Sequence, residues 1–98
     1  MKEKNDKAKL EKLCRAILSL ETVEECEAFF SDAFTIQEAE AIAQRLEVAC
    51  LLNDGKSYAD VNRDTGASTA TICRVSRCLN YGSGGYKTVI SRMEERND

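Results

Sequence analysis

The stretch from Ser57 to Asn80 constrains the fold of this chain more than any other, and it reads SYADVNRDTGASTATICRVSRCLN. It predicts two short helices, about Ser57–Asp64 and about Ser68–Leu79, joined by a tight turn at Thr65-Gly66-Ala67. Such a helix-turn-helix has a second helix that begins with small polar side chains. That shape is suited to entering the major groove of DNA.

Both predicted helices of this stretch carry recognisable start and stop signals. Ser57 and Ser68 each stand where a hydroxyl can accept a hydrogen bond from a free N–H group of a first turn. Gly66 stands where the chain must reverse, and glycine takes a positive φ without steric penalty. These signals favour a tight turn between two helices over one continuous helix.

The rest of the chain is also predicted to be helical. It has no proline, helix-forming residues dominate it, and no run of alternating β-branched residues suggests a strand. Capping boxes at Thr22/Glu25 and Thr35/Glu38 predict two helix starts, and Gly55 is expected to follow the end of the second of these helices. The expected helices cover about residues 6–20, 23–31, 36–53 and 86–96, with residues 1–5 frayed.

Apolar stripes on the outer helices suggest that the chain pairs with a second copy. On the first helix Leu10, Leu13, Cys14, Ile17 and Leu18 share one face. These stripes exceed what the short central helices can cover, so we expect residues 1–98 to form a single domain of a two-fold homodimer. Its dimerisation helices would be about 6–53 and 86–96, and its helix-turn-helix about 57–80. A two-fold axis then places two recognition helices about 34 Å apart on one side of a duplex.

Charge is distributed unevenly along the chain. The net charge is −3, which alone argues against a nucleic-acid partner. From Lys56 to Met93, however, six bases stand against two acids, a balance of +4, whereas from Glu21 to Asp54 nine acids stand against one base, a balance of −8. A polarised protein of this kind can present a basic face to DNA while its acidic part stays away.

Several classes of protein are disfavoured. The amino terminus MKEKNDKAK is too charged for a signal peptide and no apolar run approaches membrane-spanning length, so we expect a cytoplasmic protein without membrane contact. Five cysteines without a C-x-x-C pair, and no histidine, give no metal site. Most of these cysteines fall on apolar helix faces, where free cysteine acts as a small hydrophobe. We expect no cofactor and no enzymatic activity, because the cysteines lack an activating base and Gly82-Ser83-Gly84-Gly85 is no phosphate loop.

The run from Thr65 to Arg74, with Ser76 and Leu79 after it, resembles the recognition segment of the tryptophan repressor family. Phe34-Thr35, Arg45 and the segment from Ala49 to Val61 also fit that family. Within it, the chain is most similar to the Trp-repressor-related proteins of the YerC/YecD type. The resemblance implies an all-α, six-helix intertwined homodimer that binds palindromic, double-stranded operator DNA. It does not imply tryptophan as the ligand.

The resemblance also implies a site for a small effector. Arg45 and Arg74 match the two arginines that sandwich a planar corepressor in the family, a role that guanidinium stacking suits. Phe34, Thr35, Thr71, Val75 and Cys78 match other pocket positions. Val75 replaces a glycine, and such overpacking typically costs about 1–3 kcal/mol, while Cys78 replaces a serine. We therefore predict poor tryptophan binding, with either another effector of unknown identity or none. In the alternative, Arg45 pairs with an acidic neighbour such as Glu38 or Glu47 and Arg74 touches DNA phosphate.

The expected DNA contacts fall into two groups. The leading edge of the second helix should face the bases, where hydroxyl and methyl groups make weakly selective contacts; it comprises Ser68, Thr69, Ala70, Thr71 and Cys73. Basic or phenolic side chains should contact phosphates, which set affinity and not sequence: Lys56, Tyr58, Arg63, Arg74 and Arg77. Asn62 replaces a lysine of the family, and Arg63 beside it can compensate.

Two functions from different classes remain. The first is a dimeric transcriptional regulator, most simply a repressor. The alternative is a helical protein–protein interaction module that keeps the helix-turn-helix shape without specific DNA binding. The acidic segment from Glu21 to Asp54 would suit a basic partner of such a module. Binding to bulk duplex DNA at low salt separates the two.

Overall fold

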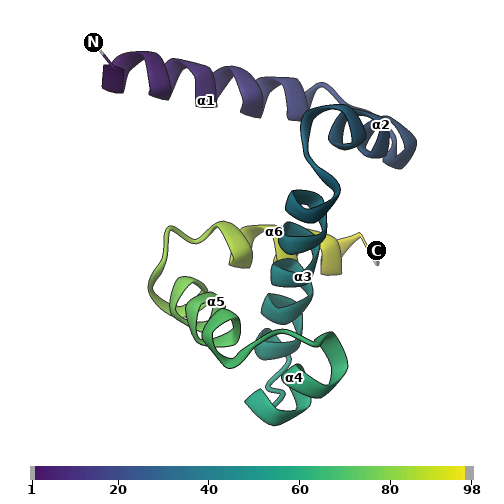
Figure 1. Ribbon diagram of the computed structural model, residues 1–98, viewed down its shortest axis with the longest axis vertical. Coiled ribbons are helices and arrows are strands. Elements are labelled where there is room, and N and C mark those ends of the chain that lie inside the picture. The colour runs from purple at the N-terminus through teal and green to yellow at the C-terminus, as the bar shows by residue number, and fades with distance from the viewer. Residues whose placement is uncertain (1, 97–98) are drawn as a thin grey trace. The chain divides into compact units, whose positions relative to one another are not determined.

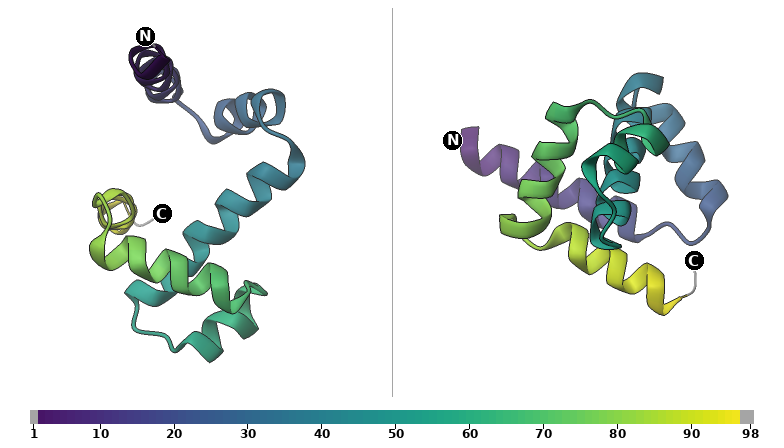
Figure 2. Two further views of the ribbon diagram at one scale, coloured as in Figure 1. Left: turned by 60° about the vertical axis from the view of Figure 1, so that its left-hand side comes forward. Right: turned by 90° about the horizontal axis from the view of Figure 1, so that it is seen from below.

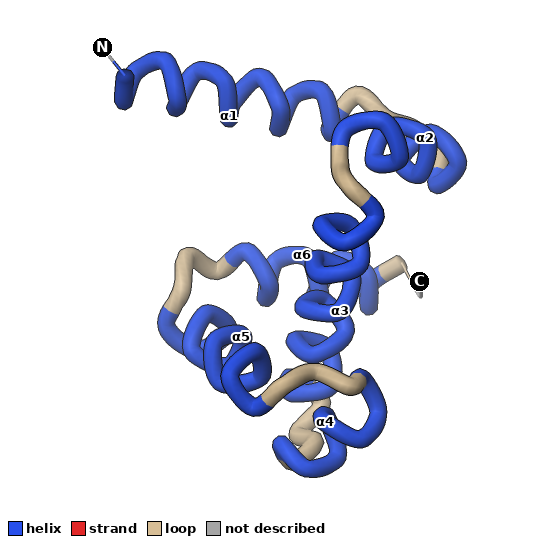
Figure 3. Tube along the Cα trace, viewed as in Figure 1, coloured by secondary structure: helices blue, strands red, loops and turns tan. Residues whose placement is uncertain are grey.

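The computed structural model describes residues 2–96, and they form six helices (Figure 1). Between the helices the described residues form loops and turns and contain no strand, as Figure 3 shows. The all-α prediction is therefore confirmed. The helices are α1 Lys2–Leu18, α2 Val23–Ala33, α3 Ile36–Asn53, α4 Tyr58–Thr65, α5 Thr69–Tyr81 and α6 Gly85–Glu95.

The chain divides into two compact units, Met1–Ala39 and Glu40–Asp98. The first unit holds α1, α2 and the first turn of α3. The second holds the remainder of α3 with α4, α5 and α6, and it contains the predicted helix-turn-helix.

In the first unit, α1 begins earlier than expected. The helix starts at Lys2, so the prediction that the segment before Asp6 is frayed is wrong for residues 2–5, while Met1 lies outside the described residues. The early residues are mainly lysine and glutamate, which have high helix propensity. An apolar stripe cannot mark the start of a helix whose first turns carry no apolar residue.

Of the two predicted capping boxes in the first unit, the one at Thr35/Glu38 forms completely and the one at Thr22/Glu25 forms in part. The Thr35 hydroxyl accepts a hydrogen bond from the Glu38 N–H at 3.1 Å, and the Glu38 carboxylate accepts one from the Thr35 N–H at 2.9 Å. The Thr22 hydroxyl likewise accepts from the Glu25 N–H at 3.1 Å. The Glu25 carboxylate, however, accepts from the N–H of Glu21, one residue before the expected donor, at 2.8 Å.

The first unit leaves its apolar side chains largely uncovered. No side chain described between residues 5 and 39 is buried. On α1, Leu10 is 61% exposed and Leu18 is 82% exposed. Phe30 and Phe34 are half-buried, and their rings meet edge-on with centroids 5.3 Å apart. These helices therefore have an apolar face without an intramolecular partner in their own unit.

The second unit contains the core. Its buried side chains come from α3 to α6 and from the turn between α4 and α5: Val48, Ala49, Val61, Ala67, Ile72, Val75, Leu79 and Ile90. Within this unit α4 and α5 pack on each other, and α5 packs on α6 (Figure 2). Helical periodicity predicts that Val61, Ile72, Val75 and Leu79 pack these helices on each other and on α3, and the burial of all four in one cluster with Val48 and Ala49 confirms it.

The interior face of α3 differs from the stripe that helical periodicity predicts, which consists of Ala39, Ile42, Ala43, Leu46, Ala49, Cys50 and Leu52. Val48 is fully buried, although the sequence pattern does not select it, whereas Ile42 is 50% exposed. The last two turns of α3 carry apolar residues at almost every position, so helical periodicity cannot choose one face there. The end of the helix is as predicted: Gly55 has φ +87°, and the N–H of Lys56 donates to the Leu51 carbonyl at 3.1 Å, as in a Schellman motif.

Candidate nucleic-acid interface

The helix-turn-helix is built by the capping residues that the sequence indicates. The Ser57 hydroxyl accepts from the Asp60 N–H at 3.1 Å, which starts α4. The Ser68 hydroxyl accepts from the Thr71 N–H at 3.2 Å, which starts α5. Between the two helices Gly66 is left-handed, with φ +74°, and its N–H closes α4 by donating to the Asn62 carbonyl at 2.9 Å.

Side chains that sequence reasoning did not single out hold the turn between α4 and α5. The Asn62 amide donates to the Ala67 carbonyl at 2.7 Å. The Thr65 hydroxyl donates to the Val61 carbonyl at 2.7 Å and accepts from the Ala67 N–H at 3.1 Å. From α3, the Gln44 amide donates to the Thr65 carbonyl at 3.2 Å. These bonds fix the geometry of the turn, and Asn62 is therefore a structural residue of the turn.

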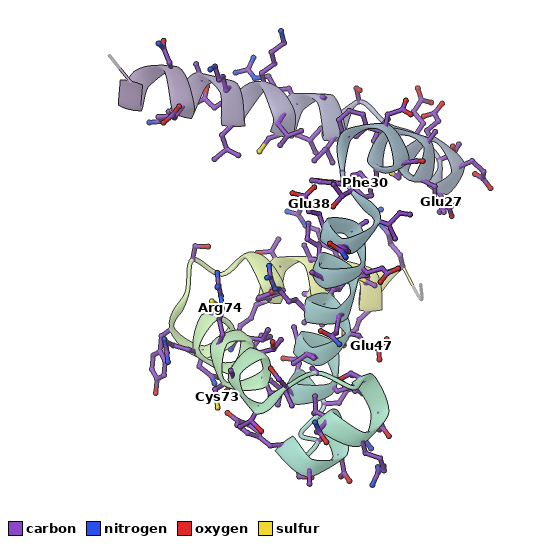
Figure 4. The ribbon with its side chains drawn as sticks, in the orientation of Figure 1. Glu27, Phe30, Glu38, Glu47, Cys73 and Arg74 are labelled. Carbon is purple, nitrogen blue, oxygen red and sulfur yellow. The ribbon has the colours of Figure 1, made fainter. Side chains whose placement is uncertain are left out.

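The helix α5 has two distinct faces. Its inner face is buried and consists of Ile72, Val75 and Leu79. Its outer face, which we call the α5 outer face, consists of the exposed residues Thr69, Ala70, Cys73, Arg74 and Arg77. Figure 4 shows Cys73 and Arg74 leaving α5 on different sides. Thr71 is half-buried, and its hydroxyl accepts from that of Ser68 at 3.1 Å.

The candidate phosphate-binding groups are all exposed, but they are not equivalent. Lys56, Tyr58, Arg63, Arg74 and Arg77 are exposed. Within the described part of the chain, Arg74 and Arg77 make no ion pair. Arg63, in contrast, pairs with both Asp60 and Asp64 on its own helix. Its pKa is raised, first by the hydrogen bond to Asp64 and then by the negative charges of Asp64 and Asp60.

An open pocket of about 550 Å³ adjoins α5 in the second unit. Its walls come from α3, the end of α5, the following loop and α6: Ile42, Arg45, Leu46, Cys78, Gly82, Ser83, Gly85, Tyr86 and Val89. The pocket brings together two of the predicted effector residues, Arg45 and Cys78. One guanidinium and one thiol in a largely apolar wall could hold a small molecule with an acidic group.

The other predicted effector residues lie elsewhere. Thr71, Arg74 and Val75 do not line the pocket, and Val75 is only 1% exposed because it belongs to the core. Phe34 and Thr35 belong to the first unit, where the Thr35 hydroxyl already accepts from Glu38. Arg45 is half-buried and forms no ion pair among the described residues, so the suggested pairing with an acidic neighbour is not formed.

The cysteines differ from their predicted environment. Cys14, Cys73 and Cys78 are exposed and the other two are half-buried. Of the predicted apolar helix faces, the one that carries Cys50 packs against the core, whereas those that carry Cys14 and Cys78 are uncovered within one chain. Burial raises the pKa of the Cys50 thiol, and the negative charges of Asp54, Glu94 and Glu47 raise it further.

Two other features are absent from the part of the chain that the structure describes. The described residues contain no group of three or more His, Cys, Asp or Glu arranged to hold a metal ion. None of the helices in residues 2–96 is both long enough and apolar enough to cross a membrane.

Known proteins resemble this chain over most of its length. A family model described as Trp repressor protein matches residues 8–94. The uncharacterized protein YerC of Bacillus subtilis (strain 168) is 51% identical over 86 residues, which cover 88% of this chain and 83% of YerC. A crystal structure from Staphylococcus aureus, described as a candidate Trp repressor, is 45% identical with a TM-score of 0.85, covering 89% of this chain and 87% of that one. The crystal structure of a TrpR like protein from Eubacterium eligens ATCC 27750 is 47% identical with a TM-score of 0.85, and the match covers 89% of this chain and 90% of that one.

Proposed function

Because this chain belongs to the Trp repressor family, we propose that it is a dimeric helix-turn-helix regulator that binds operator DNA and represses transcription. The observation that carries the proposal is the α5 outer face. This face carries small side chains near the capped start of α5 and two exposed arginines, Arg74 and Arg77. Neither arginine has an ion-pair partner among the described residues. Small side chains let a helix sit deep in a major groove, and arginines bind the phosphates that line it.

The proposed contacts divide by chemistry. Thr69, Ala70 and Cys73 face base edges, where a hydroxyl, a methyl and a thiol each read sequence weakly. Arg74, Arg77, Lys56 and Tyr58 contact phosphates and set affinity. Ser68 and Thr71 act mainly within the start of α5, because the Ser68 hydroxyl accepts from the Thr71 N–H and donates to the Thr71 hydroxyl.

Selection of bound DNA from a random duplex pool tests this proposal and supplies the operator. We then expect Arg77→Ala to weaken binding to all sequences alike and to flatten the salt dependence by about one unit for each phosphate that is no longer neutralised. Thr69→Ala should change the preferred sequence and leave that slope intact. A changed preference for Arg77→Ala with an unchanged slope would show that the contacts are assigned to the wrong residues.

The dimer is part of the proposal and is supported by the uncovered apolar side chains of the first unit. Leu10, Leu18 and Val23 are each more than half exposed in the single chain, and burying such residues against a second copy is strongly favourable. Sedimentation equilibrium should give twice the chain mass at micromolar concentration. A monomer at that concentration would contradict the proposed two-fold arrangement on DNA.

A small effector is the second element of the proposal, supported by the pocket beside α5. Arg45 would pair with an acidic group of the ligand, and Cys78 would lie against its body. Isothermal titration calorimetry should detect no micromolar tryptophan binding. Repeating the DNA selection with and without a metabolite extract would reveal another effector, and Arg45→Ala should abolish its influence. An extract that changes nothing indicates a constitutive regulator.

The competing function is a helical protein-interaction module. It is favoured by the exposed acidic residues of the first unit, which include Glu24, Glu25, Glu27 and Asp32. Such a surface suits a basic partner. Duplex binding at low salt that weakens as salt rises supports the regulator, whereas failure to bind any duplex at low salt supports the module.

A further inference from the structure

Three arginines lie on the helix-turn-helix, and one of them differs from the other two. Arg74 and Arg77 on α5 are exposed and, within the described residues, form no ion pair. Arg63 on α4 is also exposed, at 68% of its side chain, but two carboxylates hold it. The three side chains are therefore not equally available to a DNA phosphate.

The geometry around Arg63 uses both sides of its guanidinium. The Nη1 atom lies 2.9 Å from Asp60 Oδ1, and the Nε atom lies 3.1 Å from Asp64 Oδ1. One donor on each side of the guanidinium is thus directed at a carboxylate, so neither side offers an unengaged pair of donors to two phosphate oxygens. Asp60 and Asp64 carry two negative charges against one positive charge, so α4 presents a net negative charge beside α5.

We propose that Asp60 and Asp64 act as an autoinhibitory contact, which holds Arg63 away from DNA and limits the affinity of the helix-turn-helix for phosphate. The inference rests on the proposed DNA-binding function and concerns the regulation of that same surface. The carboxylates occupy the place that phosphate oxygens would take, and they repel an approaching phosphate.

The contact is weak enough to be displaced. The Asp60 and Asp64 side chains are 40% and 45% exposed, so solvent and salt screen both pairs. A phosphate held at a fixed position by a well-matched duplex can compete for Arg63, whereas a loosely held duplex competes poorly. In the native chain Arg63 therefore adds little to binding of random-sequence DNA.

A double-mutant cycle on random-sequence duplex, with salt varied, tests this contact. Arg63→Ala in the native background should change affinity less than twofold, whereas Arg77→Ala should weaken it clearly. The Asp60→Asn, Asp64→Asn double variant should bind about eightfold more tightly at 0.1 M salt for each Arg63 that gains a phosphate, because one added phosphate contact gives a salt slope of about 0.9. In a dimer, each protomer that reaches the DNA would add one such phosphate contact. Adding Arg63→Ala to that double variant should remove most of the increase in affinity.

Controls separate this contact from general charge effects. Asp32→Asn on α2 makes the same chemical change outside the helix-turn-helix and should leave affinity nearly unchanged. Asp60→Asn and Asp64→Asn are also measured singly, with thermal unfolding of each, so that a misfolded double variant cannot decide the result. Each single variant should release Arg63 in part and tighten binding by a smaller factor.

Four outcomes decide the inference. It is overturned if the native chain binds DNA and the aspartate variants do not tighten binding, which leaves the proposed function intact. It is also overturned if the tightening persists with Arg63→Ala, since simple repulsion then explains the effect. Tighter binding by the double variant that is mostly lost when Arg63→Ala is added supports it. No binding by either protein at low salt overturns both the inference and the proposed DNA-binding function.

Discussion

Replacing Asn62 by alanine tests whether the turn of the helix-turn-helix is held by a side chain. The Asn62 amide donates to the Ala67 carbonyl at 2.7 Å, and Ala67 is only 1% exposed. Asn62→Ala leaves that carbonyl buried without this donor. We therefore expect the variant to be less stable and the orientation of α5 relative to α4 to be less well fixed.

The magnitude follows from two opposing terms. A buried acceptor left unsatisfied costs about 1–3 kcal/mol. Alanine is the better helix former by roughly 0.5 kcal/mol, which offsets part of that cost. The expected net decrease is about 0.5–2.5 kcal/mol in the free energy of unfolding, measured by urea titration with circular dichroism at one fixed protein concentration.

Asn80→Ala provides a matched control on α5. The Asn80 amide also donates to a backbone carbonyl, that of Ser76 at 3.0 Å, but this bond is exposed and water can replace it. Because the gain in helix propensity is the same, this variant should be neutral or slightly stabilised. If Asn62→Ala costs no more than Asn80→Ala, the turn does not depend on the Asn62 bond and the reasoning is refuted. DNA affinity should fall for Asn62→Ala without a change in salt slope.

Three further predictions concern the core, an acid and a thiol. Ile72→Ala empties part of the core where the side chain is 1% exposed, and should cost about 2–5 kcal/mol in urea unfolding. The pKa of Glu38 is lowered from 4.5 by the hydrogen bonds from the Thr35 N–H and then from its hydroxyl. The contribution of the ionised Glu38 carboxylate to the free energy of unfolding is thus present above pH 4.5. It is lost as the pH falls through the lower pKa of the folded state. Glu38→Gln should therefore make the urea midpoint less dependent on pH below 4.5. A pH profile identical to that of the native chain would contradict this prediction. Cys50, whose pKa is raised, should be alkylated more slowly than the exposed Cys73 at pH 8 in a mass-spectrometric time course; equal rates would count against this.

The sequence predicted the parts of the fold that are written in short local signals. Ser57, Ser68 and Gly66 each act through their own neighbours, so spacing alone located the helix starts and the turn. The Thr35/Glu38 box and Gly55 likewise located the two ends of α3 at the residues observed. The burial of Ile72 and Val75 followed from helical periodicity on a segment with clear polar positions.

Features that depend on tertiary contacts were not predictable in this way. The burial of Val48 was not predicted, because apolar residues occupy several faces of the last two turns of α3 and helical periodicity cannot select one of them. Asn62 and Gln44 were missed because a polar residue that bonds a turn carbonyl has the same appearance in sequence as a surface residue. The ion pairs of Arg63 with Asp60 and Asp64 were not predicted, because acids and bases spaced along one helix have the pattern of ordinary solvated charges.

The separation of α5 into a buried face and the α5 outer face has an evolutionary consequence. Thr69, Ala70 and Cys73 make no contribution to the buried core, so substitutions there are expected to change stability by less than about 0.5 kcal/mol. Under the proposed DNA-binding function, a lineage can therefore change its operator preference at these positions without first acquiring compensating mutations. Ala67 has no such freedom, because it is 1% exposed and belongs to the buried core.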